Sequence, residues 1–494
     1  MKEQKNRREV LKLLALSGFS VFLPSCLHSE KKTGNGAATS LDTTVKDTIA
    51  SFEEAVTVND VVYFRKTDKE YDELRQSFNL NVQKFPLIIA LCKNTVGVAA
   101  AIKLANAEGL KVAVKSGGHS FESFSSIDNG LQINLSLLKS TTWNDDQTVT
   151  IEPACTLKEM YDELLPKNRI IPAGSCATVG IGGLTLGGGY GFFARKYGLT
   201  CDHLIEAILV DGLGNVHTTK TGEELMWALR GGGNGNLGVV TKLTFKTHKV
   251  PYGFTRHRFK AYKLDKERTK ELLQAYFKYS AALPESCFAA FVLNYKTMVL
   301  LITNYGEDNE PLREMLDAFS TLADKTSIGT KKNLAVSLRN YYGIQHPIYF
   351  KNASAGYYKG YESIETSIDA VLNVVFRKRG LIYQINTLGG AINTPEFESN
   401  SCYPHRNIPY LSELQAYWEE GKNPEVLIES FEEIQGILYD HGIKRQYRNY
   451  PHKGFKDWET AYYGDNYKKL QEIKKKYDPN DVFSHEQTVK LKKY

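Results

Sequence analysis

The stretch from Pro172 to Gly191, PAGSCATVGIGGLTLGGGYG, constrains the fold of this chain more than any other part of its sequence. It contains eight glycines: Gly174, Gly180, Gly182, Gly183, Gly187, Gly188, Gly189 and Gly191. Each loses roughly 0.5–1 kcal/mol more in conformational free energy on folding than alanine would. Apolar residues such as Ile181 and Leu184 alternate with the glycines, which argues against a flexible linker. We therefore expect backbone that comes close to a ligand, with N–H groups able to cradle phosphate oxygens.

Two further glycine turns flank this stretch. One is KSGGHS at residues 115–120, and the other runs from residue 229 to residue 238. The chain has no Gly-x-x-x-x-Gly-Lys-Ser/Thr motif, which argues against a P-loop. No glycine run follows a clear strand-turn-helix unit with an acidic residue downstream, which argues against a Rossmann fingerprint. The glycines alone do not identify the ligand.

The three glycine turns, with the closing motifs YDPNDVF at 477–483 and EQT at 486–488, resemble the FAD-linked oxidases of the vanillyl-alcohol oxidase superfamily, most closely its berberine-bridge-enzyme-like branch. The resemblance extends from about Tyr71 to the C-terminus. It implies an α+β fold, with a PCMH-type FAD-binding domain in two parts and a substrate domain made of an antiparallel sheet backed by helices. We expect the FAD-binding domain at 59–252, the substrate domain at 253–440, and a C-terminal segment at 441–494 that returns to the FAD-binding domain.

The resemblance also implies that FAD is bound covalently at two positions. In that family the histidine of an S-G-G-H turn bonds to the flavin 8α-methyl, and a cysteine in an A-G-x-C turn bonds to flavin C6. His119 and Cys176 match these positions. A merely hydrogen-bonded histidine and an ordinary buried thiol are the alternatives. The other expected cofactor contacts are Ser116, Gly117, Gly118, Ser120, Gly174, Thr178, Val179, Gly180, Gly182, Gly183, Gly188, Gly189, Gly191, Gly238, Val240 and Asn449. Leu184 departs from the family pattern, in which a histidine is frequent at that position.

Tyr450 is the candidate catalytic base. Residues 447–450 read YRNY, and in the family the tyrosine that follows the asparagine lies near the flavin N5 edge. The alternative is a packed aromatic side chain. A tyrosine with an unperturbed pKa near 10 is a poor base at neutral pH, so a cation or a hydrogen-bond donor must stabilise its phenolate. Arg448 and Lys453 are close enough in sequence to be considered for that role.

Gln384 and Asn386 are further candidate catalytic residues, because they alternate with Ile385 on a predicted strand. This alternation favours a substrate-facing surface, and an exposed sheet face is the alternative. The expected reaction transfers hydride from an alcohol or sugar hydroxyl, including the anomeric carbon of an oligosaccharide, to FAD. Val179 favours dioxygen as electron acceptor, since family members with valine three residues after the attachment cysteine tend to be oxidases. A dehydrogenase with another acceptor and a flavin-bearing binding lipoprotein without turnover are the alternatives.

Residues 1–26 have the pattern of an export signal. A charged segment with Arg7 and Arg8 precedes an apolar stretch at 13–23 that is too short to cross a bilayer. The arginines resemble a twin-arginine signal, the route for proteins exported already folded, and LPSC at 23–26 resembles a lipobox in which Cys26 is lipidated. A plain cleaved signal or an uncleaved anchor is the alternative. With a tether at 27–58, we expect a periplasmic or cell-surface protein held to the membrane through this lipid.

Composition and charge indicate which partners, metal sites and disulfides to expect. A formal net charge of +6 over 494 residues is mild and the basic residues are scattered, so we expect no nucleic-acid partner. Five cysteines remain besides Cys26 and Cys176: Cys92, Cys155, Cys201, Cys287 and Cys402. None has C-x-x-C or zinc-type spacing, so buried or free thiols are expected rather than a metal site, with at most two disulfides.

Apolar periodicity predicts the main secondary-structure elements. Strands are expected at 86–91, 111–115, 131–135, 148–152, 207–210, 239–245, 288–295, 298–305 and 381–386. Helices are expected at 95–108, 157–165, 311–322, 424–441 and 465–477.

Overall fold

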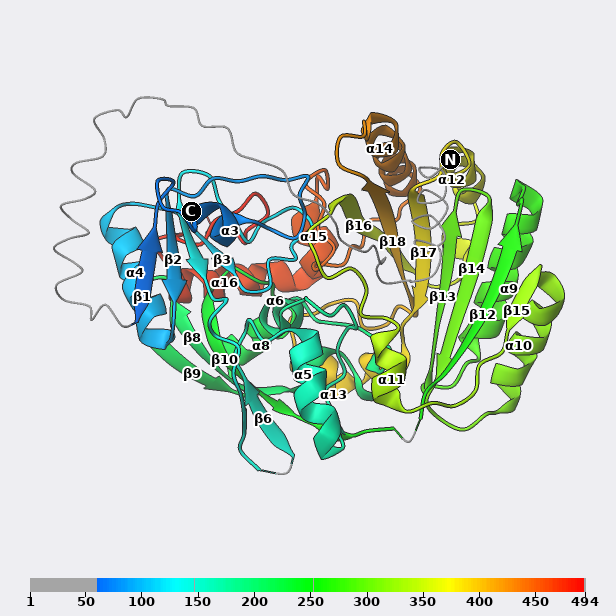
Figure 1. Cartoon of the computed structure of the whole chain (residues 1–494), viewed down its shortest axis with the longest axis horizontal. Coiled ribbons are helices and arrows are strands. Elements are labelled where there is room, and N and C mark those ends of the chain that lie inside the picture. Colours follow the sequence, from blue (N-terminus) through cyan, green and yellow to red (C-terminus); the bar gives the residue numbers. More distant parts are fainter. Residues whose placement is uncertain (1–59, 146, 252, 493–494) are drawn as a thin grey trace.

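The computed structural model describes residues 60–145, 147–251 and 253–492, so the predicted export signal and tether lie outside the described residues. The architecture is α+β, as the resemblance implies (Figure 1). A four-stranded, a five-stranded and a two-stranded sheet lie in one half of the molecule, and a seven-stranded sheet forms the other. No helix in the described ranges has both the length and the apolar character needed to cross a bilayer.

The first part of the N-terminal half is a four-stranded sheet in the order β1-β2-β4-β3. Its strands are β1 (Val61–Phe64), β2 (Ile88–Cys92), β3 (Val112–Lys115) and β4 (Leu131–Asn134). Helix α4 (Thr95–Ala107) connects β2 to β3, and the Asn94 side chain caps it by accepting a hydrogen bond from the Gly97 amide at 2.9 Å. Because β3 is the edge strand of this sheet, the turn that follows it is delivered to the edge.

The second part is a five-stranded antiparallel sheet in the order β5-β6-β10-β8-β9. Its strands are β5 (Thr141–Trp143), β6 (Thr148–Ile151), β8 (Leu204–Asp211), β9 (Val216–Lys220) and β10 (Gly238–Lys246). Helix α5 (Leu157–Leu164) follows β6 and begins with a capping box between Thr156 and Glu159. The short elements of this half are α3 (Tyr71–Arg75), β7 (Arg169–Ile170), α7 (Ala194–Tyr197), α8 (Glu224–Leu229) and β11 (His248–Lys249).

Part of the glycine-rich stretch is helical, although no helix was predicted there. It contains the short helix α6 (Ile181–Leu186), which the Thr185 hydroxyl reinforces by donating a 2.7 Å hydrogen bond to the Ile181 carbonyl. Helix α6 buries Ile181 and Leu186, so the apolar residues between the glycines serve the core.

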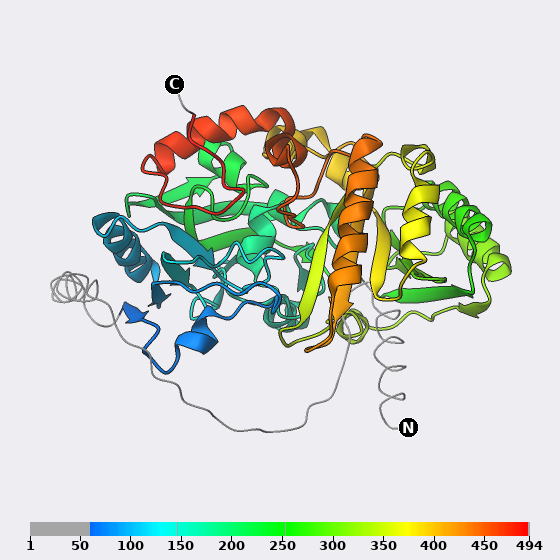
Figure 2. The ribbon, with the colours of Figure 1, turned by 90° about the horizontal axis from the view of Figure 1, so that it is seen from above.

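The other half is built on a seven-stranded antiparallel sheet in the order β15-β12-β14-β13-β17-β18-β16. Its strands are β12 (Thr255–Tyr262), β13 (Cys287–Asn294), β14 (Thr297–Asn304), β15 (Lys325–Ser327), β16 (Tyr349–Tyr358), β17 (Leu381–Thr387) and β18 (Tyr410–Trp418). Helices α9 (Lys266–Ala281), α10 (Glu310–Leu322), α12 (Ile368–Val375) and α14 (Glu425–Asp440) cover its outer face (Figures 1 and 2). Two short helices, α11 (Leu334–Arg339) and α13 (Pro395–Ser399), lie in the connections.

The two faces of this sheet belong to different cores. On β17, Tyr383 and Ile385 pack with the outer helices, whereas Ile382 packs in the core shared with the N-terminal half. Gln384 and Asn386 alternate with the outward residues and are 1% and 0% exposed. The alternative of an exposed sheet face is therefore wrong, because both side chains face the N-terminal half.

The C-terminal segment packs back on the N-terminal half. It contains α15 (Trp458–Tyr463) and α16 (Tyr467–Tyr477), and Figure 2 shows α16 lying along that half. The Tyr477 carbonyl accepts a hydrogen bond from the Gly212 amide at 2.7 Å. Directly after α16, the buried Asp478 carboxylate accepts hydrogen bonds from Lys474 Nζ at 2.7 Å and from the Val482 amide at 2.8 Å. The closing motif thus anchors the chain end through a buried ion pair.

The elements predicted from periodicity are present, with bounds within two residues of the expected ones except that β8 begins three residues earlier. Five cysteines of the described ranges are buried and form no disulfide there: Cys92, Cys155, Cys201, Cys287 and Cys402.

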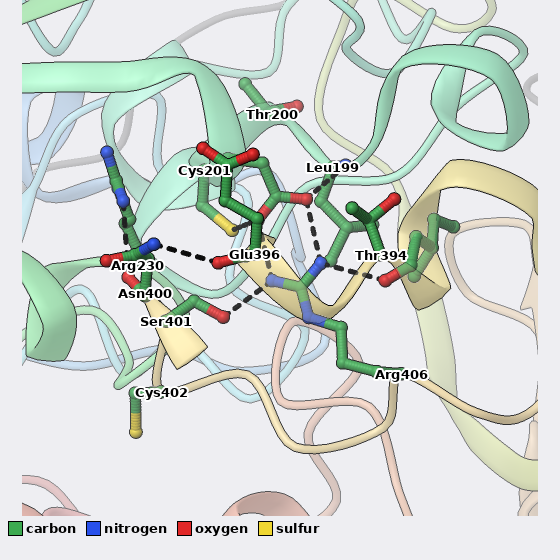
Figure 3. A network of polar contacts seen from close by, with 12 residues as sticks. Leu199, Thr200, Cys201, Arg230, Thr394, Glu396, Asn400, Ser401, Cys402 and Arg406 are labelled. Carbon is green, nitrogen blue, oxygen red and sulfur yellow. Dashed lines mark hydrogen bonds and ion pairs between the residues drawn. The ribbon is translucent and has the colours of Figure 1, made fainter. Parts of the chain in front are cut away.

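A buried ion pair joins the two halves (Figure 3). Asp202, in the turn after α7, accepts hydrogen bonds of 2.8 and 2.6 Å from the two terminal nitrogens of Arg406. Neither side chain is more than 1% exposed. Arg406 also donates to the Ser401 hydroxyl at 2.6 Å and to the Ile392 carbonyl at 3.2 Å. Arg406 therefore holds the loop before β18 against the N-terminal half.

We expect Arg406→Leu to lower the free energy of unfolding by about 3–5 kcal/mol, because a buried carboxylate would lose its charge partner. Arg377→Leu is the matched control, since Arg377 pairs with Glu433 on the surface, and its loss should cost no more than about 1 kcal/mol. Urea denaturation followed by intrinsic fluorescence measures both changes. Equal destabilisation by the two substitutions would contradict the role assigned to Arg406.

Candidate active site

A cavity lies between the two halves of the molecule. Its walls come from the turn after β3, from residues 174–184, from strands β16, β17 and β18, and from residues 447–451. The predicted site residues that line it are Ser116, Gly117, Gly118, His119, Ser120, Gly174, Cys176, Val179, Gly180, Gly183, Asn449 and Tyr450. Leu184, the departure from the family pattern, lines it as well. Residues from all three glycine turns and from the chain end therefore meet at one place.

The other predicted site residues do not line this cavity. Thr178, Gln384 and Asn386 touch residues that line or border it, as described below. Gly182, Gly188, Gly189, Gly191, Gly238 and Val240 pack against protein instead. At Gly191, for example, a Cβ would lie 2.0 Å from the Ala173 carbonyl oxygen. Close backbone packing is a sufficient reason for glycine at that position.

Two of the glycine turns touch through their backbones at the cavity wall. A Cβ on Gly117 would lie 2.4 Å from the Gly180 nitrogen, and a Cβ on Gly180 would lie 2.8 Å from the Gly117 nitrogen. No other residue type has a side chain small enough for this contact. The contact brings His119 and Cys176, which follow different strands, to the same cavity.

His119 is held in a defined orientation. Its ring stacks on Phe78, with centroids 4.0 Å apart, and its Nε2 hydrogen-bonds the Thr178 hydroxyl at 2.9 Å. Burial lowers the pKa of the imidazole to about 3, so the ring is neutral at physiological pH. Cys176 is the one cysteine of the described ranges that is not buried. A neutral imidazole and an accessible thiol are both suited to forming a covalent bond.

Tyr450 lies against the same cavity, partly buried. Its ring stacks on Phe121 with centroids 5.1 Å apart, and its hydroxyl is 3.0 Å from the Tyr190 hydroxyl. Neither cation considered from sequence reaches it: Arg448 Nε donates to the Tyr463 hydroxyl, and Lys453 pairs with Glu486. Burial, and after it the charge of the Glu413 carboxyl, raise the pKa of the Tyr450 phenol. Tyr190 is the hydrogen-bond partner of the Tyr450 hydroxyl; the contact raises the pKa of Tyr450 when Tyr450 donates, and would favour the phenolate only with Tyr190 as the donor.

The seven-stranded sheet forms the roof of the cavity and is called the roof sheet below. A chain of hydrogen bonds crosses this sheet and ends at Tyr450. Its members, each donating to the next, are Asn352, Tyr417, Gln415, Gln384, Asn386 and Tyr190. The Asn386 amide donates to the Tyr190 hydroxyl at 3.2 Å, so the proton of Tyr190 is free to be donated to the Tyr450 oxygen. Gln384 and Asn386 therefore act on Tyr450 through Tyr190.

The cavity also offers groups that fit the diphosphate of FAD. Arg448 lines it, is 4% exposed, and has no carboxylate within ion-pair distance in the part of the chain described here. Its guanidinium lies over the Phe124 ring at 5.7 Å. The hydroxyls of Ser125 and Ser175, on the same walls, have no hydrogen-bond partner within the protein. A buried cation needs a counter-ion, and the free hydroxyls and glycine-turn amides can donate to phosphate oxygens.

Several residues of the site were not predicted from sequence. Glu413, Gln415 and Tyr417 on β18 line the cavity, and they alternate with outward-facing residues in the same way as Gln384 does on β17. That period-of-two signal could have identified them. Tyr190 carries no such signal, because its role depends on a hydroxyl contact with a residue 260 positions away.

Comparisons with known proteins agree with this geometry. A family model described as "FAD binding domain" matches residues 86–220, and one described as "Berberine and berberine like" matches residues 446–490. The chain is 29% identical to the uncharacterized FAD-linked oxidoreductase YgaK of Bacillus subtilis, with 86% of this chain and 95% of that protein covered. It is 27% identical to glucooligosaccharide oxidase of Sarocladium strictum, with 86% and 91% covered.

Solved structures show the same fold. The structure of BBE-like 1 of Physcomitrella patens superposes with a TM-score of 0.81 at 25% identity, with 92% of this chain and all of that chain covered. A chitooligosaccharide oxidase superposes with a TM-score of 0.81 at 24% identity, with 91% of this chain and all of that chain covered. Both matched segments contribute walls of the cavity, and the family models, relatives and superposed structures together support a PCMH-type FAD-binding, berberine-bridge-enzyme-like FAD-linked oxidoreductase.

Proposed function

We propose that this protein is an oxidase that carries FAD on both His119 and Cys176, takes hydride from an alcohol or sugar hydroxyl, and reduces dioxygen to hydrogen peroxide. The observation that carries the proposal is that His119 and Cys176, from two crossing glycine turns, line one cavity with Tyr450. The printed names of two relatives, glucooligosaccharide oxidase and chitooligosaccharide oxidase, support an oligosaccharide as substrate.

The cofactor, when bound, accepts a hydride and returns two electrons to dioxygen. The protein's part is to fix its position and to manage the substrate proton. Stacking on Phe78 and the hydrogen bond to Thr178 restrain the His119 ring. A flavin bonded to that ring would therefore have little freedom to move. Val179, which lines the cavity beside Cys176, keeps the wall there smaller than leucine would.

Tyr450 accepts the hydroxyl proton as the hydride leaves the same carbon, which yields a carbonyl compound or, from an anomeric carbon, a lactone. The Tyr190 hydroxyl, 3.0 Å away, donates to the Tyr450 oxygen and so stabilises the charge that precedes proton transfer. Asn386 keeps Tyr190 in the donating orientation. The two electrons and two protons lost by the substrate balance the conversion of dioxygen to hydrogen peroxide.

An aerobic screen of oligosaccharides, alcohols and amines for hydrogen peroxide tests the function, with anaerobic bleaching of the flavin measured in parallel. An oxidase gives both signals with the same compound. Bleaching with little peroxide would indicate a dehydrogenase that uses another acceptor. A binding lipoprotein without turnover would give neither signal with any compound.

We expect the protein to stay yellow after acid denaturation, because two covalent bonds hold the flavin. His119→Ala and Cys176→Ala should each retain bound flavin, and only the double substitution should release free FAD. Absorbance of the precipitated protein and mass spectrometry of its peptides measure the attachment. Quantitative release of FAD from the unsubstituted protein would refute the proposed linkages.

We expect Tyr450→Phe to fold and keep its flavin but to slow anaerobic flavin reduction at least about a hundredfold, the low end of the effect of removing a positioned base. The substrate is the compound that bleaches the unsubstituted protein fastest, and stopped-flow absorbance measures the rate. Tyr439→Phe, at a hydroxyl that bonds Asp457 on the surface, is the matched control and should be neutral. Slowing of less than about tenfold would mean that Tyr450 serves only packing.

We further propose that the protein is exported folded and lipid-anchored, on the basis of the N-terminal sequence. Replacing both Arg7 and Arg8 by lysine should leave flavin-loaded protein in the cytoplasm, since the twin-arginine route requires the arginine pair. Cys26→Ala should free the exported protein from membranes. Cell fractionation measures both, and normal distribution of the two variants would count against this proposal.

A further inference from the structure

Glu413 is a buried carboxyl group in the roof of the cavity. It lies on β18, in register with Gln384 on β17 and Ser354 on β16, and is 4% exposed. The same face of β18 carries the apolar Leu411, which packs in the core shared by the two halves. A carboxyl at this position is costly to bury, so its surroundings should show what compensates for it.

No cation among the described residues forms an ion pair with this carboxyl. Within the described ranges, the groups whose charge couples to it are the phenols of Tyr190, Tyr417 and Tyr450, and the one side chain that partly offsets its burial is the amide of Gln415. Burial raises the pKa of Glu413 to about 8. The carboxyl therefore lies at the boundary between its neutral and charged forms near physiological pH, and a nearby cation would decide which form is present.

A second acceptor without a partner lies on the same face of the sheet. Asn352 pairs in register with Gln415, two residues along β18 from Glu413, so the Asn352 and Glu413 side chains are diagonal neighbours. The Asn352 amide donates to the Tyr417 hydroxyl at 2.8 Å, which commits its nitrogen. Its buried carbonyl oxygen has no hydrogen-bond partner within the protein. Both groups thus present acceptors to the cavity.

Aromatic rings line the same cavity as this pair of acceptors. The Phe350 ring lies 5.6 Å from that of Phe121 and 6.0 Å from that of Tyr417, and all three residues line the cavity. The face of an aromatic ring attracts cations. It also packs against the apolar face of a sugar ring. A cavity that combines these acceptors with aromatic rings complements a group that has donors and positive charge but no acceptor.

We propose that Glu413 and the carbonyl oxygen of Asn352 bind a protonated amine of the substrate, which makes the substrate class an amino sugar. This inference rests on the proposed function for the hydroxyl that is oxidised. An ammonium group carries three donors and no acceptor, and charge-assisted hydrogen bonds to a carboxylate are strong. A plain sugar hydroxyl would use one of these acceptors and leave the other unpaired.

Three disaccharides that differ at one substituent test the proposal: the β-1,4-linked disaccharide of glucosamine, its N-acetylated form, and cellobiose. Binding is measured by anaerobic calorimetry at pH 7, in two buffers of different ionisation enthalpy, with chemically reduced holoprotein so that no turnover occurs. We expect the glucosamine disaccharide to bind at least about tenfold more tightly than cellobiose. Because the Glu413 pKa is about 8, its binding should also release most of one proton.

Glu413→Gln should reduce the preference for the amine to less than about threefold and abolish proton release, since the amide keeps the shape but not the charge. Glu433→Gln, the same change on the outer face of α14, is the matched control and should alter neither. The absorbance spectrum of the flavin checks that the variants are folded. The preference and the proton release of the unsubstituted protein remain decisive if Glu413→Gln does not fold.

Equal or weaker binding of the glucosamine disaccharide, no binding of any of the three, or a preference that survives Glu413→Gln would each overturn the amine site. Reduction of the oxidised flavin by the same sugars is measured separately. Tight binding of the amino sugar without flavin reduction would leave the amine site standing and count against the proposed oxidation. The two proposals therefore fail in different experiments.

Discussion

The contact between the backbones of Gly117 and Gly180 is the constraint on which the site depends. A Cβ at either position would overlap the other turn, so the two turns can meet only as glycines. One turn is fixed by β3 at the edge of the first sheet, and the other leads into α6. Since His119 and Cys176 each lie a few residues from this contact, a shift of either turn would separate the two proposed flavin linkages.

The roof sheet solves a different problem, because it must bury polar side chains without leaving them unpaired. Its outer face packs on helices with apolar residues such as Tyr383 and Leu414. Its inner face carries amides and phenols that satisfy one another in a directed chain ending at Tyr450. In a low-dielectric site such a chain polarises its members in one direction. The sheet thus directs a hydrogen-bond donor toward the Tyr450 oxygen, which is proposed to take the proton.

Local patterns predicted the parts of this site that local sequence controls. His119 and Cys176 were expected from the family resemblance of their turns, and both line the cavity. The alternation around Ile385 predicted Gln384 and Asn386, which are two members of the hydrogen-bond chain. The short helix α6 was not predicted, because glycines disfavour a helix and the apolar spacing that buries Ile181 was given too little weight. The partner of Tyr450 was assigned to nearby cations, yet it is Tyr190, brought there by the packing of the two halves. Contacts made only by tertiary packing leave no periodic signal in one sequence.

The electrostatics of the cavity link substrate binding to proton transfer. An ionised Glu413 raises the pKa of Tyr450, after the larger effect of burial, and so opposes formation of the phenolate. Because no cation from the described residues offsets this charge, ionisation of Glu413 and ionisation of Tyr450 oppose each other. With a pKa of about 8, Glu413 is largely neutral at pH 7, so the effect of its charge on Tyr450 grows as the pH rises past that value. A protonated amine bound to Glu413 would neutralise the carboxylate and so protect the phenol from this effect at alkaline pH.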